Sequence, residues 1–267
     1  MLCVLDIETV PDIDLIRQDL DPESTLEPLE LCAKAFEWQK AKSGYEFLPL
    51  YWHKVVSIAA VLADTHGHFI KVGNFGRQEG QKRDEKHLVA DFLSFFNHQK
   101  PMLISFNGRN FDLPTLMLKA LAYNLDARAF YDQSNKWENY RYRYSEAFHT
   151  DLLDSLSQFG AQRLKLDGVC SMAGLPGKFG LSGECVHEIY YTQESDRLER
   201  IDLYCQGDVL NTYWLYLKYI LSKGALAKEH YLNILVDFKN KLPQDKPYSE
   251  VFTQALEREI QTEMQED

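Results

Sequence analysis

Short apolar runs in the first half of the chain mark the strands of a sheet. Residues 2–8, LCVLDIE, form one such run, which carries two acids at alternate positions near its end and is closed by Pro11. The runs at 55–64 and 69–75 are separated by the turn sequence THGH and predict a β-hairpin. The run MLISFN at 102–107 predicts a further buried strand. The pattern therefore predicts three meandering strands and a fourth that follows later.

Helical periodicity accounts for much of the remaining chain. The stretch 84–97, DEKHLVADFLSFFN, predicts an amphipathic helix with an acidic first turn. The segment after the run at 102–107 turns into a helix near Asp112, and residues 149–159 are expected to pass from a strand end into a helix. A long apolar-periodic helix begins near Ser195. Strands and helices in this order predict an α/β domain.

The organisation of the chain favours one domain with two helical additions. No internal repeat and no convincing linker interrupts it. Residues 12–50 are charged, with apolar residues at helical spacing, and predict a helical insertion plus a loop. Residues 223–267 hold two more helical segments, split by LPQDKPYS. We therefore expect a main domain at 1–222 and a helical C-terminal extension at 223–267 that packs on it.

Composition limits the classes of protein that fit. An apolar content of 45% in 267 residues is enough for a sizeable core. No stretch reaches the roughly 18 apolar residues of a membrane helix, and the N-terminus lacks the features of a signal peptide, so a cytoplasmic location is expected. The cysteines are odd in number and scattered, which predicts reduced core thiols and not a disulfide framework or a zinc site.

The net charge of −11 argues against a broad basic surface that coats nucleic acid. Non-specific affinity for nucleic acid comes from lysines and arginines that neutralise phosphates, and this chain has an excess of acids. A nuclease that contacts phosphate through bound cations is a partial exception, because the cations reverse the local field. Acidity therefore lowers the expectation of tight, processive binding and leaves phosphodiester chemistry open.

Acids recur where apolar elements end. Asp6 and Glu8 are spaced i, i+2 on a strand, so both point to one face and can share a cation. Asp112 follows a second buried strand, at the first turn of a helix. Tyr204 and Asp208 are spaced i, i+4 and lie on one face of the long helix. Taken singly, each group also fits a structural role, as strand-end caps or as a hydrogen-bonded core pair.

Together the three segments resemble a known group of nucleases. DIETVPD at 6–12, FNGRNFDLP at 106–114 and YCQGDVLNTY at 204–213 resemble, in that order, the Exo I, Exo II and Exo III motifs of the DEDDy 3′→5′ exonucleases. The likeness is greatest to the predicted exonucleases related to the proofreading domain of family-B DNA polymerases. It runs over about residues 2–220.

The resemblance implies a metal-dependent hydrolase. Two divalent cations, Mg²⁺ or Mn²⁺, would be held by four carboxylates: Asp6, Glu8, Asp112 and Asp208. Tyr204 takes the place that histidine has in the sister DEDDh group, and its hydroxyl would orient the attacking water. The physical chemistry agrees, because two cations about 3.5–4 Å apart stabilise both oxygens of a phosphodiester displacement. Four converging carboxylates without cations would repel one another strongly.

Other residues would hold the nucleotide. Asn107 is in a position where the family has a polar residue that contacts the terminal nucleotide, although a plain turn residue fits equally well. Phe111 could stack on a base or sugar. Lys178 resembles a lysine that contacts the scissile phosphate in family-B proofreading domains, but a solvated turn is slightly favoured for it.

The stretch 136–148, KWENYRYRYSEAF, interleaves arginines with aromatic residues. Such alternation suits stacking and phosphate contacts with a single strand. It also suits an ordinary exposed hairpin, and the hairpin is the favoured interpretation.

The resemblance implies a ribonuclease H-like fold: a mixed five-stranded sheet with its second strand antiparallel, flanked by helices, with the acids at the carboxyl ends of the central strands. The expected substrate is the 3′ end of single-stranded DNA, released as nucleoside 5′-monophosphates. An exoribonuclease that trims RNA 3′ ends is the nearest alternative, and a catalytically silent module that binds nucleic acid or protein is another. A role in proofreading or DNA repair would need a DNA polymerase or repair protein as partner in trans. No membrane partner is expected.

Overall fold

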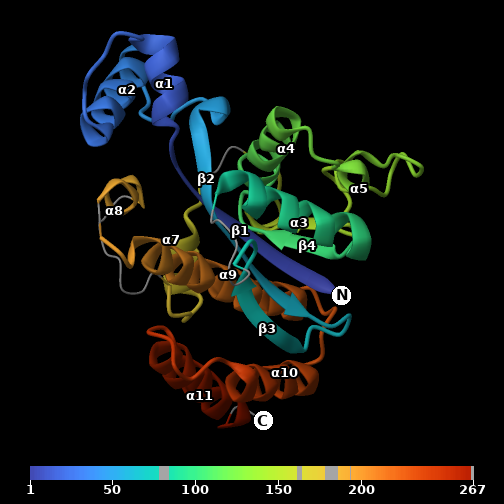
Figure 1. Ribbon diagram of the computed structural model, residues 1–267. Coiled ribbons are helices and arrows are strands. Elements are labelled where there is room, and N and C mark those ends of the chain that lie inside the picture. Colours follow the sequence, from blue (N-terminus) through green and yellow to red (C-terminus); the bar gives the residue numbers. More distant parts are fainter. Residues whose placement is uncertain (78–83, 161–163, 178–185, 193, 266–267) are drawn as a thin grey trace.

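The computed structural model describes residues 1–77, 84–160, 164–177, 186–192 and 194–265 (Figure 1). The predicted Lys178 lies outside these residues. Within them, a central sheet carries helices on both of its faces.

The sheet has five strands in the order β3-β2-β1-β4-β5. They are β1 (Leu2–Pro11), β2 (His53–Ala63), β3 (Phe69–Asn74), β4 (Met102–Ser105) and β5 (His149–Asp151). The second strand runs antiparallel to both of its neighbours, whereas β4 and β5 run parallel to β1. This is the ribonuclease H-like arrangement that the sequence predicted.

Helices occupy the connections between strands and the chain after β5. Before β4 these are α1 (Ile13–Leu20), α2 (Pro28–Ser43), the short 3₁₀ helix η1 (Leu50–Trp52) and α3 (Glu85–Gln99). Between β4 and residue 192 they are α4 (Asp112–Tyr123), α5 (Arg128–Tyr131), α6 (Leu152–Leu156), α7 (Leu166–Met172) and α8 (Val186–Tyr191). The last three are α9 (Arg197–Ser222), α10 (Lys228–Lys241) and α11 (Ser249–Gln265).

Alternation along β1 decides which helices each of its side chains meets. Leu2 and Val4 belong to the core on the side of α9, α10 and α11. Cys3 and Leu5 belong to the core on the side of α3 and α4. Because successive side chains of a strand point to opposite faces, Asp6 shares the face of Leu2 and Val4. The even-numbered acids of β1 are thereby directed towards α9.

The end of β1 that carries the acids extends beyond the end of β4. Its parallel pairing with β4 covers only Leu2 to Val4, whereas its antiparallel pairing with β2 continues to Pro11. Asp6 and Glu8 therefore lie beyond the carboxyl end of β4, on the side where no strand pairs with them. A register shift follows directly after Glu8.

The insertion between β1 and β2 has a small core of its own. Ile16, Leu31, Ala35, Leu48 and Trp52 are buried together there. The Trp52 indole N–H donates to Asp19 at 2.7 Å, which ties η1 to α1. In Figure 1 α1 and α2 stand away from the sheet, beyond one end of β2.

The C-terminal helices share the core of the sheet. Phe238 of α10 packs against Phe69 of β3 at 4.9 Å and against Tyr213 of α9 at 5.1 Å, measured between ring centroids. Phe252 of α11 packs against Phe238. Residues 223–265 are therefore part of the same hydrophobic core as the strands.

The prediction of a hairpin at residues 136–148 is wrong. Turns and bends occupy these residues, without strand pairing. Buried Tyr140 anchors the segment by packing on Phe96 and by donating its hydroxyl to the Pro101 carbonyl at 2.8 Å. An aromatic ring in the core holds this loop, so it needs no ladder of backbone hydrogen bonds.

Two predictions from composition can be compared with the structure. Four cysteines, Cys3, Cys32, Cys170 and Cys205, are buried free thiols. No helix in the described part of the chain is both long enough and apolar enough to cross a membrane.

Phe238→Ala is expected to destabilise the protein by about 3–5 kcal/mol, because it leaves a cavity among the aromatic rings of Phe69, Tyr213, Trp214 and Phe252 in the core. The melting temperature should fall by about 6–20 °C. Val236→Ala on the same helix is the control, since Val236 is 41% exposed and its truncation should cost no more than about 0.5 kcal/mol. Equal melting temperatures for the two variants would show that α10 does not contribute to the core.

Candidate active site

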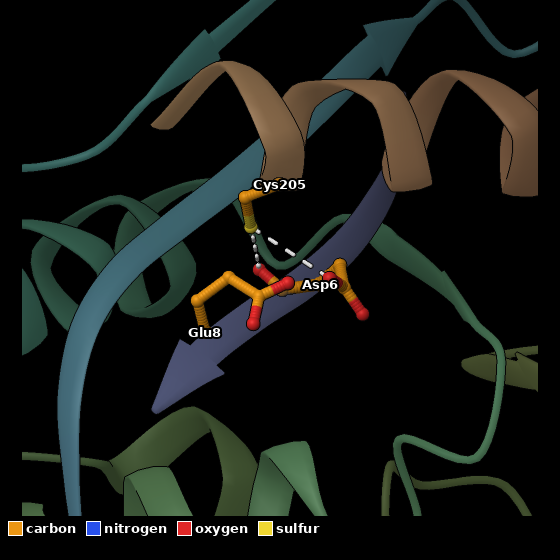
Figure 2. A group of neighbouring side chains, drawn as sticks. All are labelled: Asp6, Glu8 and Cys205. Atoms are coloured by element: carbon orange, nitrogen blue, oxygen red, sulfur yellow. Dashed lines mark hydrogen bonds between the residues drawn. The ribbon is translucent and has the colours of Figure 1, made fainter. Parts of the chain in front are cut away.

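Two acids of β1 and one residue of α9 form the centre of the site. Figure 2 shows Asp6 and Glu8 on the strand, with Cys205 directed at them from the helix. One potential ligand atom from each of the three residues lies within 4.8 Å of the others. The Cys205 thiol donates to the Asp6 carbonyl at 3.5 Å and lies 3.7 Å from its carboxylate. Burial raises the pKa of Cys205, so the thiol keeps its proton.

Asp112 reaches the same centre from the start of α4. Its Oδ1 accepts the backbone N–H of Ile7 at 3.1 Å, between the two acids of β1. The side chain is buried, and burial is the main cause that raises the pKa of Asp112 to about 7, with the negative charge of Asp151 adding to it. The hydrogen bond fixes the third acid against the first strand.

The turn before α4 is held by one buried carboxylate. Asp151 accepts the backbone N–H groups of Asn107 at 2.8 Å and Arg109 at 2.9 Å. Gly108 lies so close to Ser105 that a Cβ atom there would collide with the serine side chain. Asp151 therefore shapes the turn that delivers Asp112 and does not itself join the cluster of acids.

The long helix α9 contributes Tyr204 and Asp208. Two residues before Tyr204, buried Asp202 accepts hydrogen bonds from Ser57 at 2.8 Å and from Arg77 Nε at 2.6 Å, which fixes the rotation of α9 on β2. Burial raises the pKa of Tyr204, and the charges of Asp208, Glu8 and Asp6 add to this effect together with a hydrogen bond to Asp208. The phenol therefore remains protonated beside the acids.

The electrostatics of Asp6 show that the four acids interact. Burial raises the pKa of Asp6 well above its usual value, and the negative charges of Asp112, Glu8 and Asp208 raise it further. Carboxylates from β1, α4 and α9 thus repel one another in a partly desolvated place. An all-oxygen set of this kind fits a hard divalent cation such as Mg²⁺ or Mn²⁺, whose charge would remove the repulsion.

A cleft of about 500 Å³ opens beside the acids. Asp6, Tyr204 and Asp208 line it, together with Lys165 and Asn211. The cleft gives the acids access to a ligand.

Asn211 connects α9 with Gly177, another residue that lines this cleft. Its buried side chain donates to the Gly177 carbonyl at 2.8 Å and accepts the Gly177 N–H at 3.0 Å, as a paired strand would. Gly177 has a positive φ of 68°, and a Cβ atom there would come within 2.9 Å of Asp167. The spacing of Asn211 from Asp208 within one helix could have indicated its place. Nothing in the sequence distinguishes Lys165 from an ordinary surface lysine.

Comparison with known proteins gives the chain a family. The family model described as "Predicted 3'-5' exonuclease related to the exonuclease domain of PolB" matches residues 45–256. The chain belongs to this family. The matched span includes Asp112, Tyr204 and Asp208, whereas Asp6 and Glu8 precede it. Exonucleases of this kind act on nucleic acid and use divalent metal ions.

Solved structures add a likeness in shape. The family B DNA polymerase from the hyperthermophilic archaeon Pyrobaculum calidifontis is similar to this exonuclease with a TM-score of 0.47 and 17% sequence identity. The alignment covers 94% of the present chain and 27% of the polymerase chain, so the exonuclease spans about a quarter of that polymerase. Among curated proteins, none matches the chain.

Two residues predicted to contact the nucleotide, Asn107 and Phe111, have different surroundings in the exonuclease. Asn107 has a positive φ of 70°, and its side-chain oxygen accepts from Asn110 at 3.0 Å, as suits a turn residue. Phe111 makes edge contacts with Phe47 and His53, at 5.6 Å and 5.2 Å between ring centroids. Phe47 comes from the insertion, which sequence spacing did not connect with Phe111. Contacts of Asn107 and Phe111 with substrate stay predictions.

Asp6→Asn is expected to raise the melting temperature in metal-free buffer, by about 2–4 °C for each kcal/mol of repulsion that it removes. It should also reduce the rise in melting temperature that Mn²⁺ produces in the unmodified protein, because a ligand is lost. Glu37→Gln, which neutralises an exposed acid of α2, should change neither quantity. A lowered metal-free melting temperature with an undiminished Mn²⁺ effect would contradict a metal site at Asp6.

Proposed function

We propose that this exonuclease hydrolyses single-stranded DNA from the 3′ end and releases nucleoside 5′-monophosphates, using two divalent cations held by Asp6, Glu8, Asp112 and Asp208. The observation that carries the proposal is the mutual repulsion of acids from β1, α4 and α9 beside an open cleft. A purely structural cluster would place partners of opposite charge there, because buried like charges are costly. The preference for DNA rests on the resemblance to polymerase proofreading domains alone.

Cations bound at these acids would stabilise negative charge on the attacking and leaving oxygens of the phosphodiester. The protein contributes by holding the four carboxylates in fixed positions. Asp6 and Glu8 share one face of β1, and the hydrogen bond from Ile7 holds Asp112 against them. A preorganised set of this kind needs little rearrangement when the substrate binds.

The Tyr204 hydroxyl is assigned the task of orienting the attacking water. Two observations support this assignment: Tyr204 forms a hydrogen bond to Asp208, and it lines the cleft together with Asp6 and Asp208. Because its pKa is raised, the hydroxyl is protonated at neutral pH and acts as a hydrogen-bond donor, not as a base.

A cation on the protein side would bind the phosphate of the strand. Lys165 lies on the cleft with Tyr204 and Asp208 and is exposed. Lys178 is a second candidate for the scissile phosphate, on the resemblance already given. Either lysine would offset part of the charge that the acidic cluster presents to an approaching strand. Proofreading or repair with a separate polymerase or repair protein is the cellular role we propose.

Tyr204→Phe is expected to lower the turnover number by on the order of 10²–10⁴, because it deletes a positioning contact of the reaction. The ring is kept, so the melting temperature should change by only about 1–3 °C. The affinity for Mn²⁺ should be unchanged, since the four acids are intact. Turnover on a labelled single strand and calorimetric titration with Mn²⁺ measure both quantities.

Tyr219→Phe is the matched control for this variant. It removes a phenolic hydroxyl from the same helix, where that group donates to Glu146 at 2.6 Å. Its turnover should equal that of the unmodified protein. If Tyr204→Phe stays within about twofold of this control, the hydroxyl has no part in catalysis.

A 3′-phosphate on a labelled single strand should slow digestion strongly, and a 5′-phosphate should not, because the reaction requires a free 3′ end in the cleft. Gel electrophoresis of the labelled products reads this polarity directly. Parallel reactions with RNA measure whether the protein prefers DNA or RNA. An Asp208→Ala preparation, which is expected to be inactive, controls for contaminating host nucleases. Digestion of circular single-stranded DNA at an equal rate would show an endonuclease and overturn the proposed polarity.

A further inference from the structure

A second depression of about 240 Å³ lies on the far side of the turn that leads to Asp112. Arg109, Asn110 and Pro114 line it from the turn and α4, and Phe130, Arg141 and Arg143 line it from the following segment. We call it the arginine groove. Asn110 donates to Asn107 at 3.0 Å, so one turn connects the groove with the residues around Asp112.

The segment that carries the outer arginines has a defined shape. Buried Asn139 donates its side-chain amide to the Asn135 carbonyl at 2.8 Å and accepts the N–H of Arg141 at 3.0 Å. The next residue, Tyr140, is fixed in the core by its ring and its hydroxyl. The backbone at Arg141 is therefore held by the Asn139 side chain and by the neighbouring Tyr140, whereas the Arg141 side chain is exposed.

The arginines of the groove differ in how their charge is balanced. Arg143 makes two hydrogen bonds to the buried carboxylate of Asp154. Arg109 donates to the carbonyls of Tyr140 and His149, with Asp154 at 4.0 Å. Arg141 lies over the Tyr131 ring at 5.6 Å, and no carboxylate among residues 1–77, 84–160, 164–177, 186–192 and 194–265 pairs with it. Its charge is available to a ligand.

Exposed aromatic rings lie on the same segment of chain as this available charge, and one of them, Tyr131, lies beneath it. Tyr131 is 53% exposed, Trp137 59% and Tyr144 69%, values far above those of the core. Residues 128–144 contain four basic and two acidic side chains, whereas the whole chain carries a net charge of −11. A locally basic, aromatic surface on an acidic protein matches a polyanion with flat apolar groups.

We propose that the arginine groove binds the single-stranded part of a nucleic acid a few nucleotides from its 3′ end, with Arg141 contacting a backbone phosphate and Trp137 stacking on a base. The assignment of this strand to a substrate rests on the proposed function. Bases stack on aromatic rings regardless of sequence, so the groove confers affinity without sequence preference. It would counteract the repulsion of the strand by the overall negative charge.

Fluorescence anisotropy of a labelled single strand of about 12 nucleotides, measured in Ca²⁺, tests binding without requiring hydrolysis. Arg141→Ala should raise the Kd by about tenfold and reduce the slope of log K against log salt by about 0.7, the value for one phosphate contact on a single strand. Trp137→Ala should raise the Kd without changing the slope. Arg141→Lys should keep the slope.

Arg128→Ala is the matched control. Arg128 belongs to the same segment, lies outside the groove and pairs with Asp126. Its removal deletes the same charge and should leave the Kd within about twofold of the unmodified protein. Equal effects of Arg141→Ala and Arg128→Ala would overturn the proposal, and so would tighter binding of a blunt duplex than of the single strand.

Hydrolysis separates this proposal from the proposed function. Arg141→Ala should raise the KM for the long strand and leave kcat, and the rate on a dinucleotide, unchanged. If the protein binds the strand through Arg141 but hydrolyses nothing, the proposed function fails and the groove stands. If hydrolysis proceeds and Arg141→Ala has the kinetics of Arg128→Ala, the groove fails and the function stands.

Discussion

Repulsion between carboxylates at the end of β1 is the constraint on which the site depends. Asp6 lies close to the negative charges of three other acids, and both its burial and these charges raise its pKa. Stability alone would select against such a cluster, because uncompensated buried charge is costly. The rest of the fold must therefore hold the acids together against their mutual repulsion, and several structural devices do so.

Those devices are ordinary structural contacts used at specific points. Strand alternation turns Asp6 towards α9, and the hydrogen bond from the Ile7 N–H holds Asp112 against β1. Asp202, bound to Ser57 and Arg77, fixes the rotation of α9 and thus the direction of Tyr204. The C-terminal helices cover the outer side of α9 with aromatic rings. Rigidity in the core is thereby transmitted to the site.

The sequence predicted most of the sheet and left parts of the site unseen. Apolar runs located β1, β2 and β4 because these strands are largely buried, and the turn after β2 located β3, which is buried only at Phe69. The same reasoning failed at 136–148, where alternation of aromatic and charged residues resembled a hairpin. One ring, Tyr140, goes inward there and fixes a loop. Periodicity records which residues alternate, but it does not record that a buried ring and side-chain hydrogen bonds can replace a ladder of backbone hydrogen bonds.

Contacts between distant segments could not be predicted for the site either. Asn211 pairs with Gly177 across 34 residues, and Phe47 meets Phe111 across a longer separation. Neither contact follows from spacing within one element. Family resemblance supplied the acids, whereas the tertiary structure supplied Lys165 and Cys205.

The insertion between β1 and β2 begins and ends at neighbouring points of the sheet. Pro11 pairs with His53, and the Asp12 N–H donates to the Trp52 carbonyl at 2.7 Å. The helices α1, α2 and η1 thus form a long loop that connects the two antiparallel strands of a β-hairpin, β1 and β2. The entropy of closing such a loop grows only slowly with its length, so evolution can lengthen or shorten it without disturbing the strands. Because Phe47 of this loop contacts Phe111, a change in loop length would reshape the surroundings of the candidate active site while the sheet stays unchanged.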